Sequence, residues 1–528
     1  MKRIGDCTLW VGAGLTLVAG LLLSGINLYW GELNQDEGWY LYAAARTAEG
    51  ARPYADFAFT QGPVFTAVYA QLFRIWPVAG LQAGRLFTAL LGWATIGLGI
   101  VLVRQLAPPA WRGTATVGVL ALLGANVYHN YFSLIVKTYA LTGLLLTAAA
   151  CCLAWLSRDR LRGPALAAGW LFALAAGVRL SAGVWLPVSA LGLVLAARRY
   201  PRAWLWFGLG GVLGLAVAFG PSLLRAPAAT WFWLGPFHWA RAATDGHGGW
   251  LYRAGFFSRW LQAYYLLAAV AVVAGWGLAT SGVRRHVWPP SVGSGLLAGV
   301  GGMTLLHAAA PFPYDDYQVP VMVIGTALVL AALCHWLARL IEPSRQPAWA
   351  RAVGGILVMT GLLAAATSPR NQEWFVLGRD RIWWPVKEQA DLRVLQQTAQ
   401  FLAERTAPGD ELLTQDTYLA VEAGLRVPAG LNLGPFAYFP DWPTDVAVAR
   451  HVVNRPLLEA LLQSGTAEWA AFSDYGLAIA GPGMTPVAEA ERQRLLRLLE
   501  WHYEPYKTVP HFGQAHTPLT LYRRRAAP

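Results

Sequence analysis

The stretch NLYWGELNQDEGWYLYAAARTAEGARPYADFAFTQGP, residues 27–63, decides how the rest of the chain is interpreted. It follows an apolar run that is long enough to cross a bilayer as a helix. Just beyond that run lie two adjacent carboxylates, Asp36 and Glu37, at the head of a predicted short helix. An acidic pair at this depth in an otherwise apolar and basic chain points to a function beyond packing.

The composition of the chain is that of a membrane protein. Of its 528 residues, 56% are hydrophobic and only 13% are charged, whereas soluble domains carry roughly 25% charged residues. The 26 Trp, 20 Tyr and 20 Phe suit the aromatic belts at bilayer surfaces. The net charge of +12 comes mostly from basic residues in short loops between apolar runs, which determines membrane topology and does not indicate a nucleic-acid partner.

Because about 20 apolar residues span a bilayer as a helix, the apolar runs predict about eleven transmembrane helices. These are placed near residues 9–29, 80–103, 114–130, 134–156, 164–180, 181–197, 204–224, 260–280, 291–309, 317–338 and 353–367. The basic start and the lack of a small-residue cleavage site predict that the first span is retained. The four cysteines lie in or beside apolar runs without metal-ligand spacing, so we expect no structural disulfide.

The positive-inside rule orients these spans in the inner (plasma) membrane. With Lys2 and Arg3 cytoplasmic, every second loop carries arginines, whereas the short loops near 129–134 and 310–316 carry no Lys or Arg. The longer outside loop 225–259 does contain arginines, but long loops carry little weight in this rule. The external loop 30–79 with its acidic pair therefore lies outside the cytoplasm, and so does the chain after the last span.

The chain divides into a membrane domain, residues 1–367, and an extracytoplasmic C-terminal α/β domain, residues 368–528. In the second part, residues 386–406 have apolar residues at helical spacing. The segments RPLLEALLQSG and EAERQRLLRLLEWH are also predicted helices, and DELLTQD and PLTLYRRR are predicted strands. The predicted fold class is mainly α: a polytopic transmembrane helical fold with a small external α/β domain.

The ionisable residues within or beside the spans all fall at the outer face. Such residues are costly in a membrane and are functional candidates. Cations at the bilayer boundary suit a lipid-linked phosphate, and a carboxylate within reach could accept a proton from an attacking hydroxyl. Besides Asp36 and Glu37, the residues at this depth are Arg85, Lys137, Arg179, His307, Asp315 and Asp316.

Each of these residues also has a structural interpretation. Asp36 could cap the helix that follows, with Glu37 favoured by the positive helix start. Arg85, Lys137 and Arg179 could extend to the interface along the membrane surface. His307 could be a hydrogen-bonded core residue, Asp315 and Asp316 could cap the next span, and Tyr314 and Tyr317 could be belt aromatics. The shared depth of the charges favours a functional site.

The first external loop resembles that of the GT-C membrane glycosyltransferases, and in particular the bacterial relatives of protein O-mannosyltransferases and of lipid A aminoarabinose transferases. The matching elements are Asp36-Glu37, Tyr40, Tyr42, Gly50, Pro53-Tyr54, Asp56 and Pro63. AGRLFTALLG resembles the family's arginine-bearing second span, AAGVRLSAGVWLPVSAL its basic residue before a proline-containing span, and LLHAAAPFPYDDYQVPVMV its late external loop. The chain departs from the pattern at FSLIVKTYALTG, where Lys137 stands in place of a second acid that some relatives carry.

The resemblance implies inverting transfer of a sugar from a polyprenyl-phosphate donor to an extracytoplasmic acceptor hydroxyl. Asp36 would deprotonate the acceptor, and Glu37 would orient Asp36 or bind sugar hydroxyls. Arg85, Lys137 and Arg179 would hold the donor phosphate. The cavity would be lined by Tyr40, Asp56, His307, Tyr314, Asp315 and Tyr317. No cofactor is required and no tight metal site is expected, which leaves room for a loosely held divalent cation; the remaining partners are membrane lipids.

Two other classes of protein share some of these features. A polytopic transporter or flippase would place its substrate site near the bilayer midplane, often with internal repeats. Here the charges gather at one face and no repeat is found, which favours the enzyme. A receptor-like protein with a degenerate transferase core is the second alternative, and the intact acidic pair argues against it.

Overall fold

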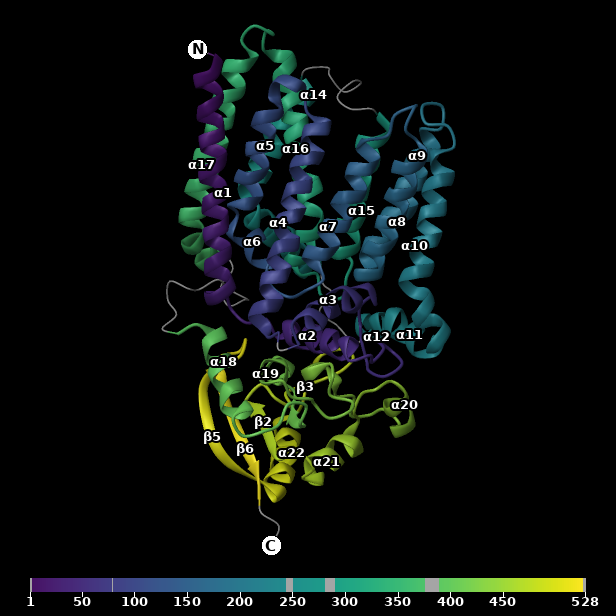
Figure 1. The fold of residues 1–528 in the computed structure, drawn as a ribbon, viewed down its shortest axis with the longest axis vertical. Helices are drawn as coiled ribbons and strands as arrows, with labels where there is room; N and C mark the ends of the chain where they lie inside the picture. Colours follow the sequence, from purple (N-terminus) through teal and green to yellow (C-terminus); the bar gives the residue numbers. More distant parts are fainter. Residues whose placement is uncertain (1, 78, 244–249, 281–289, 376–388, 526–528) are drawn as a thin grey trace.

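The computed structural model describes residues 2–77, 79–243, 250–280, 290–375 and 389–525. A bundle of long helices forms one end of the molecule, and a mixed α/β region with the C-terminus forms the other (Figure 1). Between them lie α2 (Gln35–Ala48) and α3 (Val64–Ile75) of the first external loop, together with α11 (Pro227–Leu234) and α12 (Pro236–Ala243). The predicted fold class, mainly α with a C-terminal α/β region, is confirmed.

A helix lies in each of the eleven predicted spans. Five helices are long and apolar enough to cross a membrane, and a sixth span results if the bent pair α13 and α14 is counted as one; the other apolar helices are shorter. The helices of the bundle are α1 (Lys2–Trp30), α4 (Leu81–Leu106), α5 (Arg112–Val119), α6 (Val127–Phe132), α7 (Tyr139–Ala154), α8 (Arg162–Val178), α9 (Trp185–Leu195), α10 (Ala203–Arg225), α13 (Trp250–Ala263), α14 (Tyr265–Thr280), α15 (Pro290–Ala308), α16 (Val319–Leu340) and α17 (Gln346–Phe375).

Two of the predicted spans are interrupted. The span expected at 114–130 consists of α5, a π-helical turn over Leu120–Gly124 and α6, which begins after Asn126 accepts a hydrogen bond from the backbone N–H of His129 at 2.8 Å. The span expected at 260–280 breaks at Tyr264, where α13 and α14 meet at 91°. Apolar content does not report such breaks, because residues on both sides of each break are equally hydrophobic.

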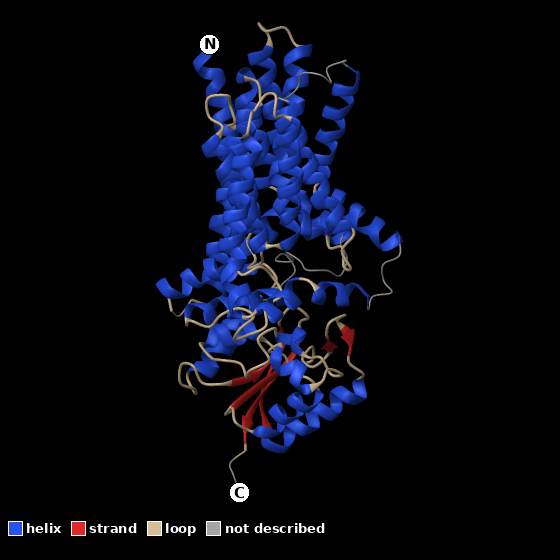
Figure 2. Ribbon diagram, turned by 90° about the vertical axis from the view of Figure 1, so that its right-hand side faces the viewer, coloured by secondary structure: helices blue, strands red, loops and turns tan. Residues whose placement is uncertain are grey.

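The C-terminal region is built on a four-stranded sheet in the order β1-β2-β6-β5. Strands β1 (Leu412–Thr414) and β2 (Trp469–Ser473) are parallel, and β6 (Thr517–Arg524) pairs antiparallel with both β2 and β5 (Tyr503–Phe512). Figure 2 shows this sheet at the end of the molecule farthest from the bundle. A short hairpin, β3 (Ile479–Ala480) and β4 (Thr485–Pro486), stands apart from the sheet.

Most of the elements predicted in this region are present. The helices α21 (Arg455–Ser464) and α22 (Glu489–His502) and strand β6 match the predicted segments, whereas β1 is shorter than DELLTQD. Of the predicted helix 386–406, α18 (Asp391–Ala403) is helical, and residues 386–388 lie outside the described residues. The remaining elements were not predicted: β2, β3, β4, β5, α19 (Thr417–Ala423) and α20 (Thr444–Ala449).

The α/β region is fixed to the first external loop and to α4 by specific contacts. The Glu422 carboxylate accepts a hydrogen bond from the backbone N–H of Leu81 at 2.7 Å, which caps the start of α4. The phenol oxygen of Tyr42 accepts from the backbone N–H of Val427 at 3.0 Å. A Cβ atom added to Gly38 would lie 2.6 Å from the backbone N of Tyr418, so α2 and α19 touch where only glycine fits.

Candidate active site

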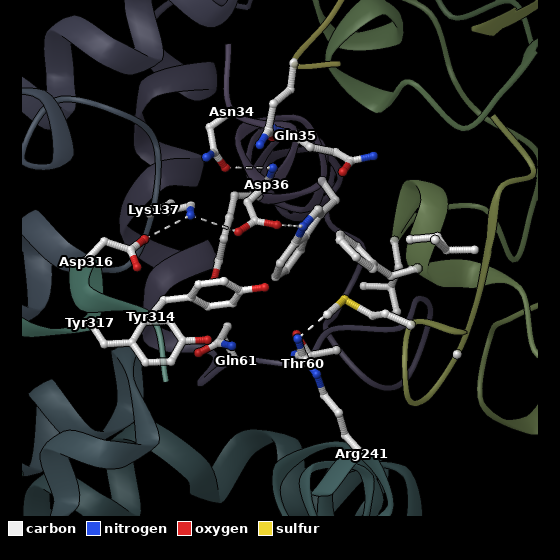
Figure 3. A pocket seen from close by; sticks show the side chains of 18 of the residues that line it. Asn34, Gln35, Asp36, Thr60, Gln61, Lys137, Arg241, Tyr314, Asp316 and Tyr317 are labelled. Atoms are coloured by element: carbon white, nitrogen blue, oxygen red, sulfur yellow. Dashed lines mark hydrogen bonds and ion pairs between the residues drawn. The ribbon is translucent and has the colours of Figure 1, made fainter. Parts of the chain in front are cut away.

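A cavity of about 710 Å³ lies where the bundle, the first external loop and the α/β region meet. Figure 3 shows part of its wall. From the membrane side and the loops it is lined by Glu32, Asn34, Gln35, Asp36, Trp39, Tyr40, Thr60, Gln61, Lys137, Tyr139, Arg179, Phe237, Arg241, Tyr314, Asp316 and Tyr317. From the α/β region it is lined by Leu433, Phe436, Tyr475, Ile479, Ala480, Gly481, Pro482, Met484, Gln514 and His516.

The first turn of α2 directs Asp36 into this cavity. Asn34 is the helix cap: its side chain accepts from the backbone N–H of Asp36 at 3.1 Å, and its own N–H donates to Glu37 at 3.0 Å. This reciprocal arrangement is a capping box. The interpretation of Asp36 as the cap is therefore wrong, and its carboxylate is available to the cavity, with 32% of the side chain exposed.

Lys137 lies between two carboxylates on the cavity wall (Figure 3). Its Nζ atom is 3.1 Å from Oδ2 of Asp36 and 3.5 Å from Oδ2 of Asp316. The Tyr139 hydroxyl donates to Asp316 at 2.8 Å, and the indole N–H of Trp39 donates to Asp36 at 3.2 Å. The structure thus brings the predicted residues Asp36 and Lys137 into contact, and it adds Asp316 as the second acid.

Asp315, which we expected in the cavity, faces away from it. Its carboxylate accepts from the Tyr128 hydroxyl at 2.6 Å and from Nε of Arg259 at 3.0 Å. Asp315 and Asp316 are consecutive residues of a 3₁₀ turn, so their side chains point to different sides. The cavity residue of this pair is Asp316.

Glu37 and Arg85 form a buried pair behind the cavity wall. Nε and Nη2 of Arg85 donate to the two carboxylate oxygens of Glu37 at 2.8 and 2.6 Å, and both side chains are fully buried. Arg85 also donates to the carbonyl oxygen of Glu32 at 2.7 Å, and Glu37 accepts from the N–H of Val136 at 3.0 Å. Neither side chain lines the cavity, so the structure gives no geometric basis for Arg85 as a phosphate ligand or for Glu37 as a sugar ligand.

Arg179 lines the cavity from the end of α8. Its guanidinium carbon lies 4.5 Å from the ring centroid of Tyr317 and 5.1 Å from that of Tyr139, and Nη1 donates to Thr138 at 3.2 Å. Among the described residues it has no carboxylate partner within an ion-pair distance, and its buried Nε atom has no hydrogen-bond partner. A guanidinium group at the cavity wall without a carboxylate partner suits an incoming anion.

The remaining predicted residues divide into two groups. Tyr40, Tyr314 and Tyr317 line the cavity, and burial raises the pKa of the Tyr40 hydroxyl, so it stays a phenol at neutral pH. Asp56 is exposed and accepts from the backbone N–H of Arg52 at 2.8 Å in its own turn, outside the cavity. His307 lies behind Tyr317 and is hydrogen-bonded to Ser181 at 2.9 Å and to Gln318 at 3.0 Å, as a core histidine is.

The α/β region supplies a wall that the sequence analysis did not predict. The turn between β5 and β6 reaches the start of α2, where the Gln514 side chain accepts from the backbone N–H of Gln35 at 2.7 Å. Residues 479 positions apart carry no local signal of such a contact. Arg241 of α12 also lines the cavity, and its guanidinium carbon lies 4.7 Å from the ring centroid of Phe312. The signal in the sequence that could have identified it is the group of arginines in the external loop 225–259.

Metal-ligating residues do not cluster in the part of the chain that the structure describes. No group of three or more His, Cys, Asp or Glu side chains there could hold a metal ion. At the cavity, the space between the carboxylates of Asp36 and Asp316 is taken by the Lys137 ammonium group.

The bundle, the external acidic loop and the α/β region over the cavity have the arrangement of the GT-C fold, and the chain is a multi-pass membrane protein with that fold. It is similar to the crystal structure of ArnT from Cupriavidus metallidurans bound to undecaprenyl phosphate, with a TM-score of 0.60 and 15% identity over 97% of this chain and 98% of that one. The apo form of the same protein matches with the same score and identity over 97% of both chains.

A second solved structure shares the fold more distantly. The Archaeoglobus fulgidus oligosaccharyltransferase in complex with Zn and sulfate has a TM-score of 0.51 and 12% identity, over 93% of this chain and 71% of that one. No protein-family model and no curated protein matches the chain. At these identities the likeness establishes the fold, and the chemistry has to be argued from the cavity.

Proposed function

We propose that this protein is an inverting glycosyltransferase that moves a sugar from a polyprenyl-phosphate donor to an acceptor hydroxyl on the extracytoplasmic side. The observation that carries the proposal is one cavity in which an accessible carboxylate, Asp36, lies beside the cations Lys137 and Arg179. The ArnT structure, which holds undecaprenyl phosphate, supports this class of donor.

Asp36 is the proposed general base. The acceptor oxygen attacks the anomeric carbon from the side opposite the phosphate and forms the new C–O bond. Its proton passes to the Asp36 carboxylate, and the bond between the anomeric carbon and the phosphate oxygen breaks. A carboxylate is a weak base at neutral pH, so the proton leaves as the bond forms and not before it.

Lys137 and Arg179 are the proposed ligands of the donor phosphate. The leaving phosphate gains negative charge as its bond to the sugar breaks, and cations already fixed in a poorly solvated wall stabilise that charge. The side chain of Lys137 is 9% exposed, and the Arg179 guanidinium group lies over the rings of Tyr139 and Tyr317. Arg85 has no part in this step; with Glu37 it fixes the start of α2 and so positions Asp36.

Lys137 also bears on the metal requirement. A divalent ion at this wall would need the oxygen atoms of Asp36 and Asp316, and the ammonium group lies 3.1 and 3.5 Å from those two carboxylates. We propose that the lysine supplies the positive charge and that transfer needs no divalent cation. Full activity in the presence of a chelator would support this, and a requirement for added metal would contradict it.

We propose that the helical bundle lies in the plasma membrane, with the N-terminus in the cytoplasm and the α/β region on the extracytoplasmic side. The acceptor then enters between the α/β region and α12, against an apolar wall that includes Phe436, Ile479 and Met484.

Sugar transfer from defined donors tests the proposal. Membranes containing the wild-type protein, Asp36→Asn or Asp56→Asn are given a panel of radiolabelled polyprenyl-phosphate sugars. The Asp56→Asn protein is the matched control, because Asp56 lies in the same external loop but outside the cavity. We expect labelled acceptor with the wild type and the control, and a loss of at least about 100-fold with Asp36→Asn.

Two results would contradict the proposal. Labelling that survives Asp36→Asn would remove the assigned base. Movement of the lipid-linked sugar across liposomes that contain the purified protein, without transfer to any acceptor, would identify a transporter instead.

A further inference from the structure

A second cavity, of about 970 Å³, lies at the end of the bundle opposite the candidate active site. It is formed by the turn between α7 and α8 and by the first residues of α8 and α10. Helix α8 starts at Arg162 in this cavity and ends next to Arg179 in the catalytic one, so the two cavities are separated by the length of that helix. Figure 1 shows α8 and α10 side by side in the bundle.

The polar part of this second cavity is strongly positive. Four arginines line it and one carboxylate, that of Asp159, accompanies them. Within the described ranges none of the four guanidinium groups forms an ion pair with a carboxylate, and the Arg162 guanidinium carbon lies 5.5 Å from the ring centroid of Trp206. The four arginines are Arg158, Arg160, Arg162 and Arg202.

The other part of the same cavity is apolar and belongs to a membrane-spanning helix. Leu205 and Leu209 are four residues apart on α10, so their side chains lie on one face of that helix, and Arg202 immediately precedes the helix at the same cavity. Leu205 is 47% exposed and Leu209 is 44% exposed. Arginines at this end follow from membrane topology, but topology alone does not require a cavity that joins them to exposed leucines.

We propose that this second cavity binds the headgroup of an anionic phospholipid from the leaflet opposite the catalytic cavity. A guanidinium group can donate two parallel hydrogen bonds to the oxygens of one phosphate. Basic pockets between transmembrane helices bind anionic lipid headgroups. The acyl chains would follow the strip of α10 that carries Leu205 and Leu209. A soluble phosphate would use only the arginines, which is why the exposed leucines favour a lipid.

Native mass spectrometry of the full-length protein in detergent tests this inference. Phosphatidylglycerol, phosphatidylcholine and inorganic phosphate are added separately. The variant Arg158→Gln/Arg160→Gln/Arg162→Gln is compared with Arg339→Gln/Arg345→Gln/Arg351→Gln, which removes the same charge around the connection between α16 and α17, outside the cavity. A single variant, Arg162→Gln, gives a milder change should the triple variant fail to fold.

We expect the wild type to retain phosphatidylglycerol at least about tenfold more than phosphatidylcholine, because only the former adds a net charge for the arginines. The preference should disappear in the cavity variant, weaken in Arg162→Gln and persist in the control variant. Equal loss in both triple variants would show a general effect of charge and overturn the site. Retention of inorganic phosphate with the same dependence on the arginines would overturn the assignment to a lipid.

Discussion

The two sides of the first turn of α2 place neighbouring carboxylates in opposite environments. Asp36 faces the cavity, with 32% of its side chain exposed and Lys137 at 3.1 Å. Glu37 faces the bundle, fully buried, and accepts hydrogen bonds from Arg85, from the N–H of Val136 and from that of Asn34. Consecutive residues of an α-helix point about 100° apart, so one turn of α2 directs one carboxylate to the cavity and the next to the bundle.

The difference shows how the molecule separates structure from chemistry. A buried charge is tolerated only when each of its polar atoms is paired, and such a group has no free lone pair for a substrate. Glu37 is in that state and fixes the loop to α4 through Arg85. Asp36 keeps part of its surface open to the cavity, as a base for an incoming hydroxyl requires.

Removal of Arg85 should have the largest effect on stability. Arg85→Ala leaves Glu37 charged and buried, which should lower the free energy of unfolding by about 3–5 kcal/mol. Thermal unfolding in detergent measures this change. Arg46→Ala, which removes the partly exposed ion-pair partner of Glu49 at the C-terminal end of α2, should cost less than about 1 kcal/mol. Equal effects of the two substitutions would mean that the Glu37 side of α2 is not structural.

Asp416 offers a pH-dependent test at the base of α19, which packs on α2. Burial raises the pKa of its carboxyl group to about 6. The folded protein therefore binds more protons than the unfolded chain between about pH 4 and pH 6, and stability falls as the pH rises through that range.

Asp416→Asn removes this ionisation. Its stability relative to the wild type should be higher at pH 7.5 than at pH 4.5 by about 2 kcal/mol, the part of the free energy of the raised pKa that falls between these two pH values. Melting temperatures at the two pH values measure the difference. If the difference in stability between Asp416→Asn and the wild type does not vary with pH, the pKa of Asp416 is not raised by folding.

Arg179→Gln tests whether this cavity residue binds the donor phosphate. Loss of its charged hydrogen bonds should weaken donor binding by about 1.5–3 kcal/mol, roughly 10–100-fold in KM for the polyprenyl-phosphate sugar. The melting temperature should change little, because no carboxylate among the described residues depends on this guanidinium. Arg225→Gln, an exposed arginine at the end of α10, is the control and should leave KM unchanged.

Gly38→Ala tests the third side of the same turn, which touches the α/β region. The added Cβ would lie 2.6 Å from the backbone N of Tyr418, so α2 and α19 must move apart, at a cost of about 1–3 kcal/mol. Gly97→Ala on α4 meets nothing within 4 Å and should not destabilise the protein. Equal melting temperatures for Gly38→Ala and the wild type would contradict the close contact.

The sequence is sufficient to predict the fold class and the depth of the site. Apolar runs determine the helices, and ionisable residues within or beside them mark the functional face, which makes Asp36, Lys137 and Arg179 candidates. Their depth also limits what they can contact. The structure then places these three residues around one cavity.

Direction and long-range contact could not be predicted in the same way. Depth does not distinguish Asp315 from Asp316, because the twist of the turn decides which carboxylate faces the cavity. Arg85 had the right depth for a phosphate ligand, but its partner Glu37 comes from a separate helix 48 residues earlier. Gln514 reaches the site only because the β5–β6 turn folds back on α2.

The separate roles of Asp36 and Glu37 are tested on one preparation of Asp36→Asn, for which both the rate of sugar transfer and the melting temperature are recorded. We expect a rate at least about 100-fold below that of the wild type. Because the partly exposed pair with Lys137 contributes little stability, the melting temperature should fall by less than about 4 °C. A wild-type rate, or a loss of rate that merely follows a large loss of stability, would contradict the division of roles between Asp36 and Glu37.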